Sequence, residues 1–160
     1  MRRNLFAIVF LLVVVFGYFL LKPNQPNKTP AISRPSSQEQ QVPIVGRIGE
    51  GYFNFEVADT DTERIQGLSG RTSLSGTDAL LFVFDTAGKH CFWMKDMKFN
   101  IDIMWFDANK KLVHEKRNVA PETFPESFCP DVAAKYVVEV SAGVAEKNQV
   151  KLGSVLDVEL

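Results

Sequence analysis

The stretch YFNFEV, residues 52–57, alternates between large apolar side chains and more polar ones, and this alternation sets the fold class. Phe53, Phe55 and Val57 fall on one side of an extended chain, as in a strand with one buried face. Similar short runs recur up to the C-terminus, separated by turn-forming residues. We predict further strands at residues 79–85, 90–95, 101–107, 112–118, 135–143 and 155–160.

Two segments have helical character instead. The sequence DTDTERIQG predicts a short helix that is capped by Asp61 or Thr62 and ended by Gly67 or Gly70. Residues 142–148 predict one or two further helical turns. Helices this few and short argue against parallel βαβ units. The expected fold is mainly β, a compact small β-barrel or sandwich of about seven short strands with two short helices.

The chain divides into three segments. Residues 5–21, LFAIVFLLVVVFGYFLL, are almost entirely apolar and follow two arginines, which predicts a single-pass anchor over residues 1–21 with a cytoplasmic N-terminus. No convincing cleavage site follows, although secretion after signal cleavage remains an alternative. Residues 22–43 contain five prolines and predict a disordered tether. Residues 44–160 then form a β-rich globular domain outside the cytoplasm.

The charge of that domain limits its partners. Residues 44–160 contain 13 basic and 18 acidic residues, without a basic stripe. This balance argues against nucleic acid, because phosphate binding needs clustered Lys and Arg. The sequence also lacks G-x-S-x-G, H-E-x-x-H and metal-ligand clusters of recognised spacing. We therefore expect no metal and no cofactor, and we expect the membrane to be a partner through the N-terminal segment.

The stretch HCFWMKDM, residues 90–97, gathers soft ligands that an exported protein could offer to copper. Strand geometry argues against this, since His90 and Cys91 would point to opposite faces. We expect Met94 and Met104 to fill gaps in the hydrophobic core instead. Trp93 is expected to be a core wall beneath a cleft.

The two strands around this stretch are expected to form a hairpin in which Lys95 pairs with Ile101. That register would place Asp102 on the same face as His90. An alternative for His90 is a histidine satisfied by a backbone carbonyl at the start of a strand. For Arg71, which follows the first helix, the alternative is a salt bridge on the surface.

Cys91 and Cys129 are the only cysteines in the chain. An oxidising compartment would allow them to pair, and the bridge would close a loop of about 37 residues. Two separate thiols, one in the core and one in a loop, remain the alternative.

Several motifs in order resemble the domain of unknown function 192 family, from about Phe55 to Leu160. They are ERIQGLSGR, ALLFVFD, HCFWMK, IDIMWFD, NVAP and YVVEVSAGVAEKNQVKLG. The resemblance implies a compact β-rich fold, often behind a signal peptide or a membrane segment, with no established activity. The matching residues include Arg71, His90, Trp93, Met94, Lys95 and Asp102. Cys91, Met97 and Met104 depart from the family pattern, which weakens a general copper function.

The function expected from these features is binding of a small molecule, glycan or peptide in the cell envelope. The candidate ligand-binding residues are Arg71, His90, Lys95 and Asp102, which are expected to line one main cleft. One alternative is an envelope hydrolase or lyase that uses His90 with Asp102. Another is a structural accessory of a membrane complex, which would have no cleft.

Overall fold

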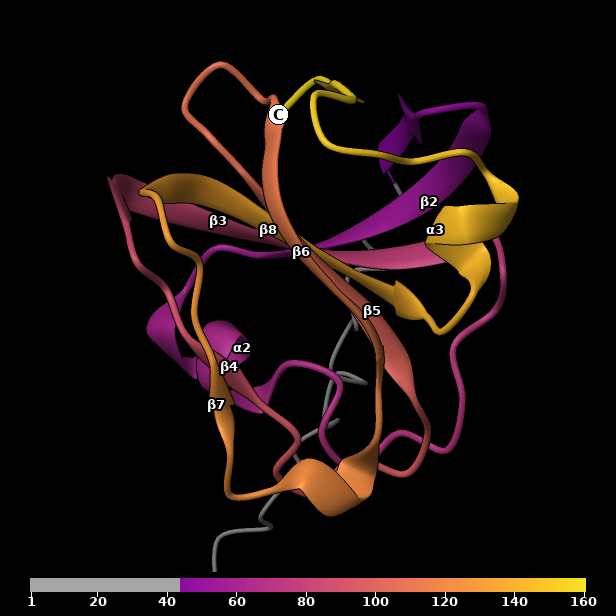
Figure 1. Ribbon diagram of the computed structural model, residues 1–160, viewed down its shortest axis with the longest axis vertical. Helices are drawn as coiled ribbons and strands as arrows, with labels where there is room; N and C mark the ends of the chain where they lie inside the picture. Colours follow the sequence, from indigo (N-terminus) through magenta and orange to yellow (C-terminus); the bar gives the residue numbers. More distant parts are fainter. Residues whose placement is uncertain (1–43) are drawn as a thin grey trace, which may run out of the picture. The chain divides into compact units, whose positions relative to one another are not determined.

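The computed structural model describes residues 44–160. This segment is mainly β: a seven-stranded sheet curls into a half-barrel, and a two-stranded ribbon and two short helices accompany it (Figure 1). The strands are β1 (Ile44–Ile48), β2 (Gly51–Ala58), β3 (Asp78–Gly88), β4 (Phe92–Trp93), β5 (Ile101–Phe106), β6 (Leu112–Val119), β7 (Ser127–Phe128), β8 (Ala134–Ser141) and β9 (Leu156–Asp157). The helices are α2 (Asp61–Gln66), the 3-10 turn η1 (Pro121–Thr123) and α3 (Val144–Lys147).

The expected anchor and tether lie within residues 1–43, outside the described part of the chain. Between residues 44 and 160, no helix is both long enough and apolar enough to cross a bilayer. The membrane segment therefore stays a prediction from the sequence.

The sheet has the strand order β6-β5-β8-β3-β2-β1-β9. Its pairs are antiparallel except for β2 and β3, which run parallel with Phe55 opposite Ala79. The expectation that parallel units are absent is therefore wrong. Helix α2 has only six residues, but the segment from Gly67 to Thr77 lengthens the crossover enough to return the chain in the same direction.

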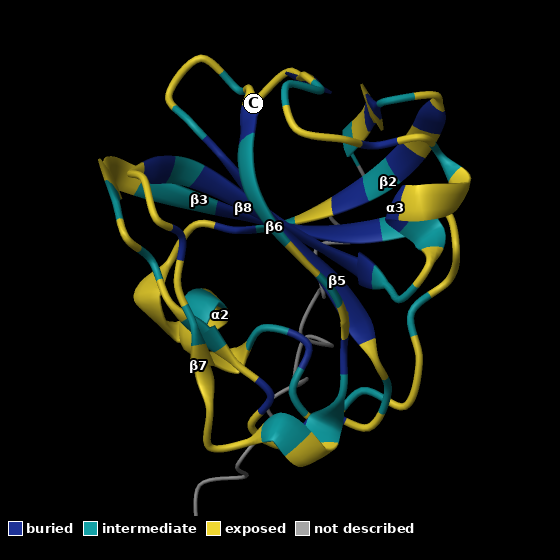
Figure 2. Cartoon of the chain, viewed as in Figure 1, coloured by how far each residue is buried: buried dark blue, intermediate teal, exposed yellow. Residues whose placement is uncertain are grey.

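The middle of the sheet is buried on both faces (Figure 2). All six residues of β5 are buried, and so are most residues of β8. One hydrophobic cluster includes Phe53 and Met104 and lies on the α3 side. The other includes Phe82 and Trp105 and lies on the side of α2 and β4. Strands β5 and β8 are therefore buried on both faces, whereas an alternating pattern predicts a strand that is buried on one face only.

Helix α2 is stabilised by its caps rather than by packing, because none of its residues is buried. Thr60 is the N-cap, and it forms a capping box with Glu63 in which each side chain accepts a hydrogen bond from the other residue's backbone N–H. Gly67 ends the helix at a φ of 48°, where a residue without a Cβ fits best. The observed N-cap precedes the expected Asp61 or Thr62, while the end at Gly67 agrees with the sequence. Arg64 ties the helix to the sheet by donating to the carbonyl of Val83 at 2.8 Å.

The hairpin expected around residues 90–106 does not form. Strand β4 contains only Phe92 and Trp93 and pairs with β7, whereas β5 pairs with β6 and β8. A turn ends β4, with the N–H of Met97 donating to the carbonyl of Met94 and with Asp96 at a φ of 56°. Strand β5 is a central strand: β6 and β8 pair with its two edges, and the two hydrophobic clusters cover its two faces.

Candidate functional site

Three of the four predicted site residues line hollows in the described part of the chain, and each lines a different one. Arg71 lines a hollow of about 630 Å³, His90 one of about 370 Å³ and Asp102 one of about 720 Å³. Lys95 lines none of these three; it is exposed, and its carbonyl accepts a hydrogen bond from Ser69. The predicted four-residue cleft is therefore not assembled.

Asp102 has a structural role at the sheet. It is only 1% exposed, and its carboxylate accepts hydrogen bonds from the backbone N–H groups of Asn118, Gly143 and Ala145 at 2.8, 2.9 and 3.3 Å. The Nη1 atom of Arg117 lies 3.8 Å from Oδ2 of Asp102. These donors fix the turn into α3 against β5, and they occupy the oxygens that a ligand or a substrate would need.

Arg71 forms the surface ion pair that was its alternative role. Both of its terminal nitrogens donate to Glu56, at 2.8 and 2.5 Å. The hydrogen bonds from Arg71 lower the pKa of Glu56, and the same bonds raise the pKa of Arg71. In the same hollow the Asn54 amide donates to Asp78 at 3.0 Å. The polar groups of this hollow are thus largely satisfied by one another.

His90 also has a backbone partner. Its Nε2 lies 3.1 Å from the carbonyl of Thr86, so Nε2 carries the proton and donates. Its ring stacks on Phe84 with 3.5 Å between centroids and 6° between planes. The carbonyl of His90 accepts from the indole of Trp105 at 2.8 Å. His90 and Asp102 lie toward opposite faces of the sheet and line different hollows, so they do not form an acid–base pair.

The hollow that contains His90 is the strongest candidate site, and we call it the α2–β4 groove. Helix α2 forms one wall, β4 and the residues before it form the other, and β3 and β8 form the floor. Its apolar lining is half aromatic, with Phe82, Phe84, Phe92 and Trp93. The other residues that line it are Asp61, Arg64, Ile65, Gln66, Gly67, Leu68, Ser69, His90, Cys91, Met97 and Glu139.

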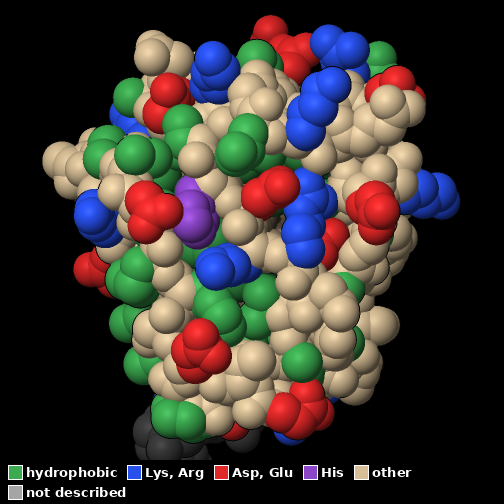
Figure 3. All heavy atoms as spheres, in the orientation of Figure 1, with side chains coloured by type: hydrophobic (Ala, Val, Ile, Leu, Met, Phe, Trp, Pro, Cys, Tyr) green, Lys and Arg blue, Asp and Glu red, His purple; other side chains and the backbone are tan. Residues whose placement is uncertain are grey.

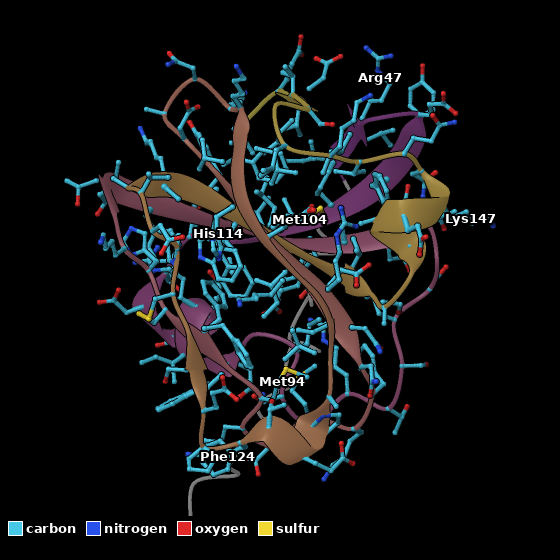
Figure 4. The ribbon with its side chains drawn as sticks, in the orientation of Figure 1. Arg47, Met94, Met104, His114, Phe124 and Lys147 are labelled. Carbon is cyan, nitrogen blue, oxygen red and sulfur yellow. A yellow bond between two sulfur atoms is a disulfide. The ribbon has the colours of Figure 1, made fainter. Side chains whose placement is uncertain are left out.

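The ring of Phe92 is held edge to face by two neighbouring rings. Phe92 meets Phe82 at 4.8 Å and 81°, and it meets Trp105 at 5.9 Å and 84°. Trp93 is 53% exposed and touches the edge of Phe124, which is labelled in Figure 4. The prediction that Trp93 is a core wall is therefore wrong. Because β4 is only a surface ribbon, its outer side chain faces solvent at the mouth of the groove.

Glu139 is the functional candidate that the sequence reasoning missed. It lies in the middle of β8, opposite Leu80 on β3 and Ile103 on β5, and it is only 4% exposed. Between residues 44 and 160, no side chain or backbone group forms a hydrogen bond or an ion pair with its carboxylate. Burial raises the pKa of Glu139 to about 8, while the positive charge of Arg71 opposes the rise. Its carboxyl group reaches the lining of the α2–β4 groove.

A signal for Glu139 was present in the sequence. The run YVVEV places one acid among four large apolar or aromatic residues, and a strand with both faces buried has no solvent side on which to put that acid. Strict alternation along residues 135–143 would instead place Glu139 on an outer face. Reading the run as a central strand would have singled it out as a buried carboxyl group.

A disulfide joins Cys91 to Cys129, with Cα atoms 4.2 Å apart. It links the residue before β4 to the residue after β7 and so closes the ribbon that carries Phe92 and Trp93. The groove wall on this side is therefore covalently fixed, although the ribbon has only two residues in each strand.

The sulfur atoms do not converge on a metal site. Met94 is 1% exposed in the cluster beside the groove, and Met104 is fully buried in the cluster on the other face of the sheet (Figure 4). Their packing as core residues is confirmed. Within residues 44–160, no three His, Cys, Asp or Glu side chains gather closely enough to hold a metal ion.

The surface charges are mixed. The face in Figure 3 carries Lys and Arg side chains interspersed with Asp and Glu side chains, and small hydrophobic groups lie between them. The candidate site is thus distinguished by its buried carboxyl group and its aromatic walls rather than by a surface of one charge.

These features define a small half-barrel domain with one aromatic groove over a buried carboxyl group. The chain belongs to the DUF192 family, described as an uncharacterized ACR, whose family model matches residues 44–158. A search of curated proteins gives no match.

Two solved structures have a similar fold. One is a protein from Sinorhizobium meliloti 1021 for which a role as a transcription regulator has been suggested; it has 21% identity and a TM-score of 0.69, with 72% of this chain and 92% of that chain covered. The other is a protein of unknown function from Novosphingobium aromaticivorans DSM 12444, with 22% identity, a TM-score of 0.66, and 74% and 84% covered. At these identities the likeness shows the fold alone.

Proposed function

We propose that this domain is a non-catalytic binding module whose ligand, a small molecule or a short segment of glycan or peptide, sits in the α2–β4 groove. The observation that carries the proposal is the composition of the groove: aromatic side chains together with a buried carboxyl group that has no partner among residues 44–160. Ligand sites are typically concave and mostly apolar, with a few well-placed polar groups. The disulfide beside β4 supports a preformed wall, which lowers the cost of ordering the site on binding.

The geometry favours binding over the two alternative functions. A hydrolase or lyase that uses His90 with Asp102 needs both groups within reach of one substrate, and they lie toward opposite faces of the sheet. A structural accessory needs no groove, and an unpaired carboxyl group below one would only destabilise such a domain.

We also propose that residues 1–21 anchor the domain to the cell membrane, so that the ligand is met outside the cytoplasm. The apolar run and its two preceding arginines support this location. The Cys91–Cys129 disulfide supports it independently, since structural disulfides are rare in reducing compartments.

The test is a ligand-observed NMR screen of the full-length protein against polar fragments of cationic, anionic and polyhydroxy character and short peptides. At least one class should bind, and Trp93→Ala should abolish its saturation-transfer signal. Tyr52→Ala is the matched control, because Tyr52 is an aromatic residue that is 70% exposed on β2 and lies outside the groove. The proposal is overturned if no fragment binds, or if the two variants affect the binding fragments equally.

A further inference from the structure

We infer that the α2–β4 groove selects a cationic head group, an alkylammonium, which binds between the Glu139 carboxylate and the aromatic walls. This inference rests on the proposed function and adds the chemical class of its ligand. It is carried by a buried acid without a partner, by the pairing of the nearby charges, and by the rings around the acid.

The first step is the isolation of Glu139. A buried ionised carboxylate is costly unless a cation or several donors compensate it. Asp102 is the internal comparison, because it is equally buried and three backbone N–H groups satisfy it. Glu139 has no such donors between residues 44 and 160, and its carboxyl group reaches the groove lining. The groove is therefore the side from which a donor can reach ionised Glu139.

The second step is the charge balance around the groove. Arg64 on α2 is paired with Asp61 at 2.6 Å. Arg71, which follows α2, is paired through both terminal nitrogens with Glu56 on β2. His90, from the segment before β4, donates to a backbone carbonyl. The strands on either side of Glu139 present Leu80 and Ile103. Ionised Glu139 is thus the one unbalanced charge among the groups that line the groove.

The third step is the aromatic lining. Phe82, Phe92 and Trp93 line the same groove as Glu139. Aromatic faces attract a cation through their quadrupole, and most strongly where water is excluded. A neutral polyhydroxy ligand would gain from the rings but would leave the carboxylate uncompensated, whereas an anion would be repelled by it. An alkylammonium matches both the acid and the rings.

The experiment follows the two indole N–H signals of the full-length protein, which contains two tryptophans. The probes are n-butylammonium, its near-isostere n-butanol and the anion butyrate. We expect n-butylammonium to shift the Trp93 signal in a saturable way, n-butanol to bind more weakly and butyrate not to bind. Glu139→Gln keeps the shape of the side chain and removes its charge, and it should weaken n-butylammonium binding by about tenfold or more.

The pH dependence of the affinity distinguishes a cationic ligand from a neutral ligand that accepts a hydrogen bond. Binding of n-butylammonium requires ionised Glu139, so its affinity should rise by about tenfold per pH unit up to a pH of about 8 and then level off. Glu139→Gln should remove this slope, and a slope that persists in this variant would contradict the role of Glu139. A ligand that accepts a hydrogen bond from neutral Glu139 would show the opposite slope above that pH.

The inference and the proposed function fail in different ways. If n-butanol binds as well as n-butylammonium and Glu139→Gln changes neither, the cation preference is wrong and the groove remains a binding site. If other fragments bind in a Trp93-dependent manner but n-butylammonium does not, the cation preference is again wrong and the groove remains a binding site. If neither these probes nor any other fragment binds, both the cation preference and the proposed binding function are wrong. Unchanged dispersion of the NMR spectrum shows that Glu139→Gln is folded.

Discussion

Arg71 gives both of its terminal nitrogens to Glu56, at 2.8 and 2.5 Å, while Glu139 in the neighbouring part of the sheet has no hydrogen-bond partner among residues 44–160. The charge of Arg71 still lowers the pKa of Glu139, but burial outweighs it and the pKa stands at about 8. This arrangement makes the stability of the domain sensitive to the ionisation of one carboxyl group.

The first prediction concerns that sensitivity. The pKa of Glu139 is raised from its usual 4.5 to about 8, so between these values the folded state holds a proton that the unfolded state has lost. The contribution of Glu139 to stability is then fully present below about pH 4.5 and is lost as the pH rises toward 8. Glu139→Gln should therefore raise the free energy of unfolding over the wild type by a growing amount between pH 4.5 and 8, and by a constant amount above.

Urea denaturation at a series of pH values measures this difference. Glu122→Gln is the matched control, because Glu122 is exposed and the substitution is the same. A difference between Glu139→Gln and the wild type that stays constant from pH 4.5 to 8 would show that Glu139 ionises normally in the folded protein.

The second prediction assigns Asp102 to the fold rather than to the site. Asp102→Asn removes charge-assisted acceptors from three backbone N–H groups, and it should reduce the free energy of unfolding by about 2–4 kcal/mol. The exposed Asp85 is the control, and Asp85→Asn should change stability by less than about 0.5 kcal/mol. Asp102→Asn should leave ligand binding at Trp93 unchanged. Loss of binding in a folded Asp102→Asn variant would return Asp102 to the site.

The third prediction compares the two tryptophans. Trp105 is fully buried and Trp93 is 53% exposed. Trp105→Ala should cost about 3–5 kcal/mol in the free energy of unfolding, because it opens a large cavity. Trp93→Ala should cost less than about 1 kcal/mol. Equal losses in urea denaturation would mean that Trp93 is packed in the core after all.

The fourth prediction concerns the disulfide. Cys91 and Cys129 are 38 positions apart, and the loop-entropy estimate for this separation is about 4 kcal/mol. Replacing both cysteines by serine should lower the urea midpoint by a corresponding amount, and reductant should do the same to the wild type. Reductant should not affect the double variant. A wild-type midpoint that ignores reductant would show that the bridge contributes nothing in solution.

The fifth prediction concerns topology. The two arginines before the apolar run should keep the N-terminus inside and place residues 44–160 outside. A reporter that is active only outside the cytoplasm should be active when it is fused after Leu160. Activity of a cytoplasm-only reporter at the same position would reverse the proposed location.

The sequence predicted the fold better than it predicted the site. Alternation over residues 52–57 matched β2, and the run IDIMWF matched β5. Pairing was harder, because β5 was expected to pair with the adjacent run and instead pairs with β6 and β8. Local pattern specifies which residues are extended, whereas the neighbours of a strand in a sheet depend on contacts between segments that lie far apart in the sequence.

The candidate site was missed because it, too, depends on which strands lie side by side. Arg71, His90 and Asp102 were expected to converge on a single cleft, but the sheet separates Asp102 from His90. Strict alternation would place the residue with the most perturbed environment, Glu139, on the outer side of a one-faced strand. Its position is set by β3 and β5, which lie on either side of β8 and far from it in the sequence.

The place of β8 in the sheet has a consequence for how the chain comes to be folded. Strands β3 and β5 are not paired with each other, because each pairs with β8, which is encoded after both. Until Ser141 has been synthesised, each therefore has an open hydrogen-bonding edge that other chains can join. Each of these two strands thus exposes one unpaired edge until the C-terminal part of the domain arrives, and a chain truncated before Ala134 lacks the strand that joins the two halves of the sheet.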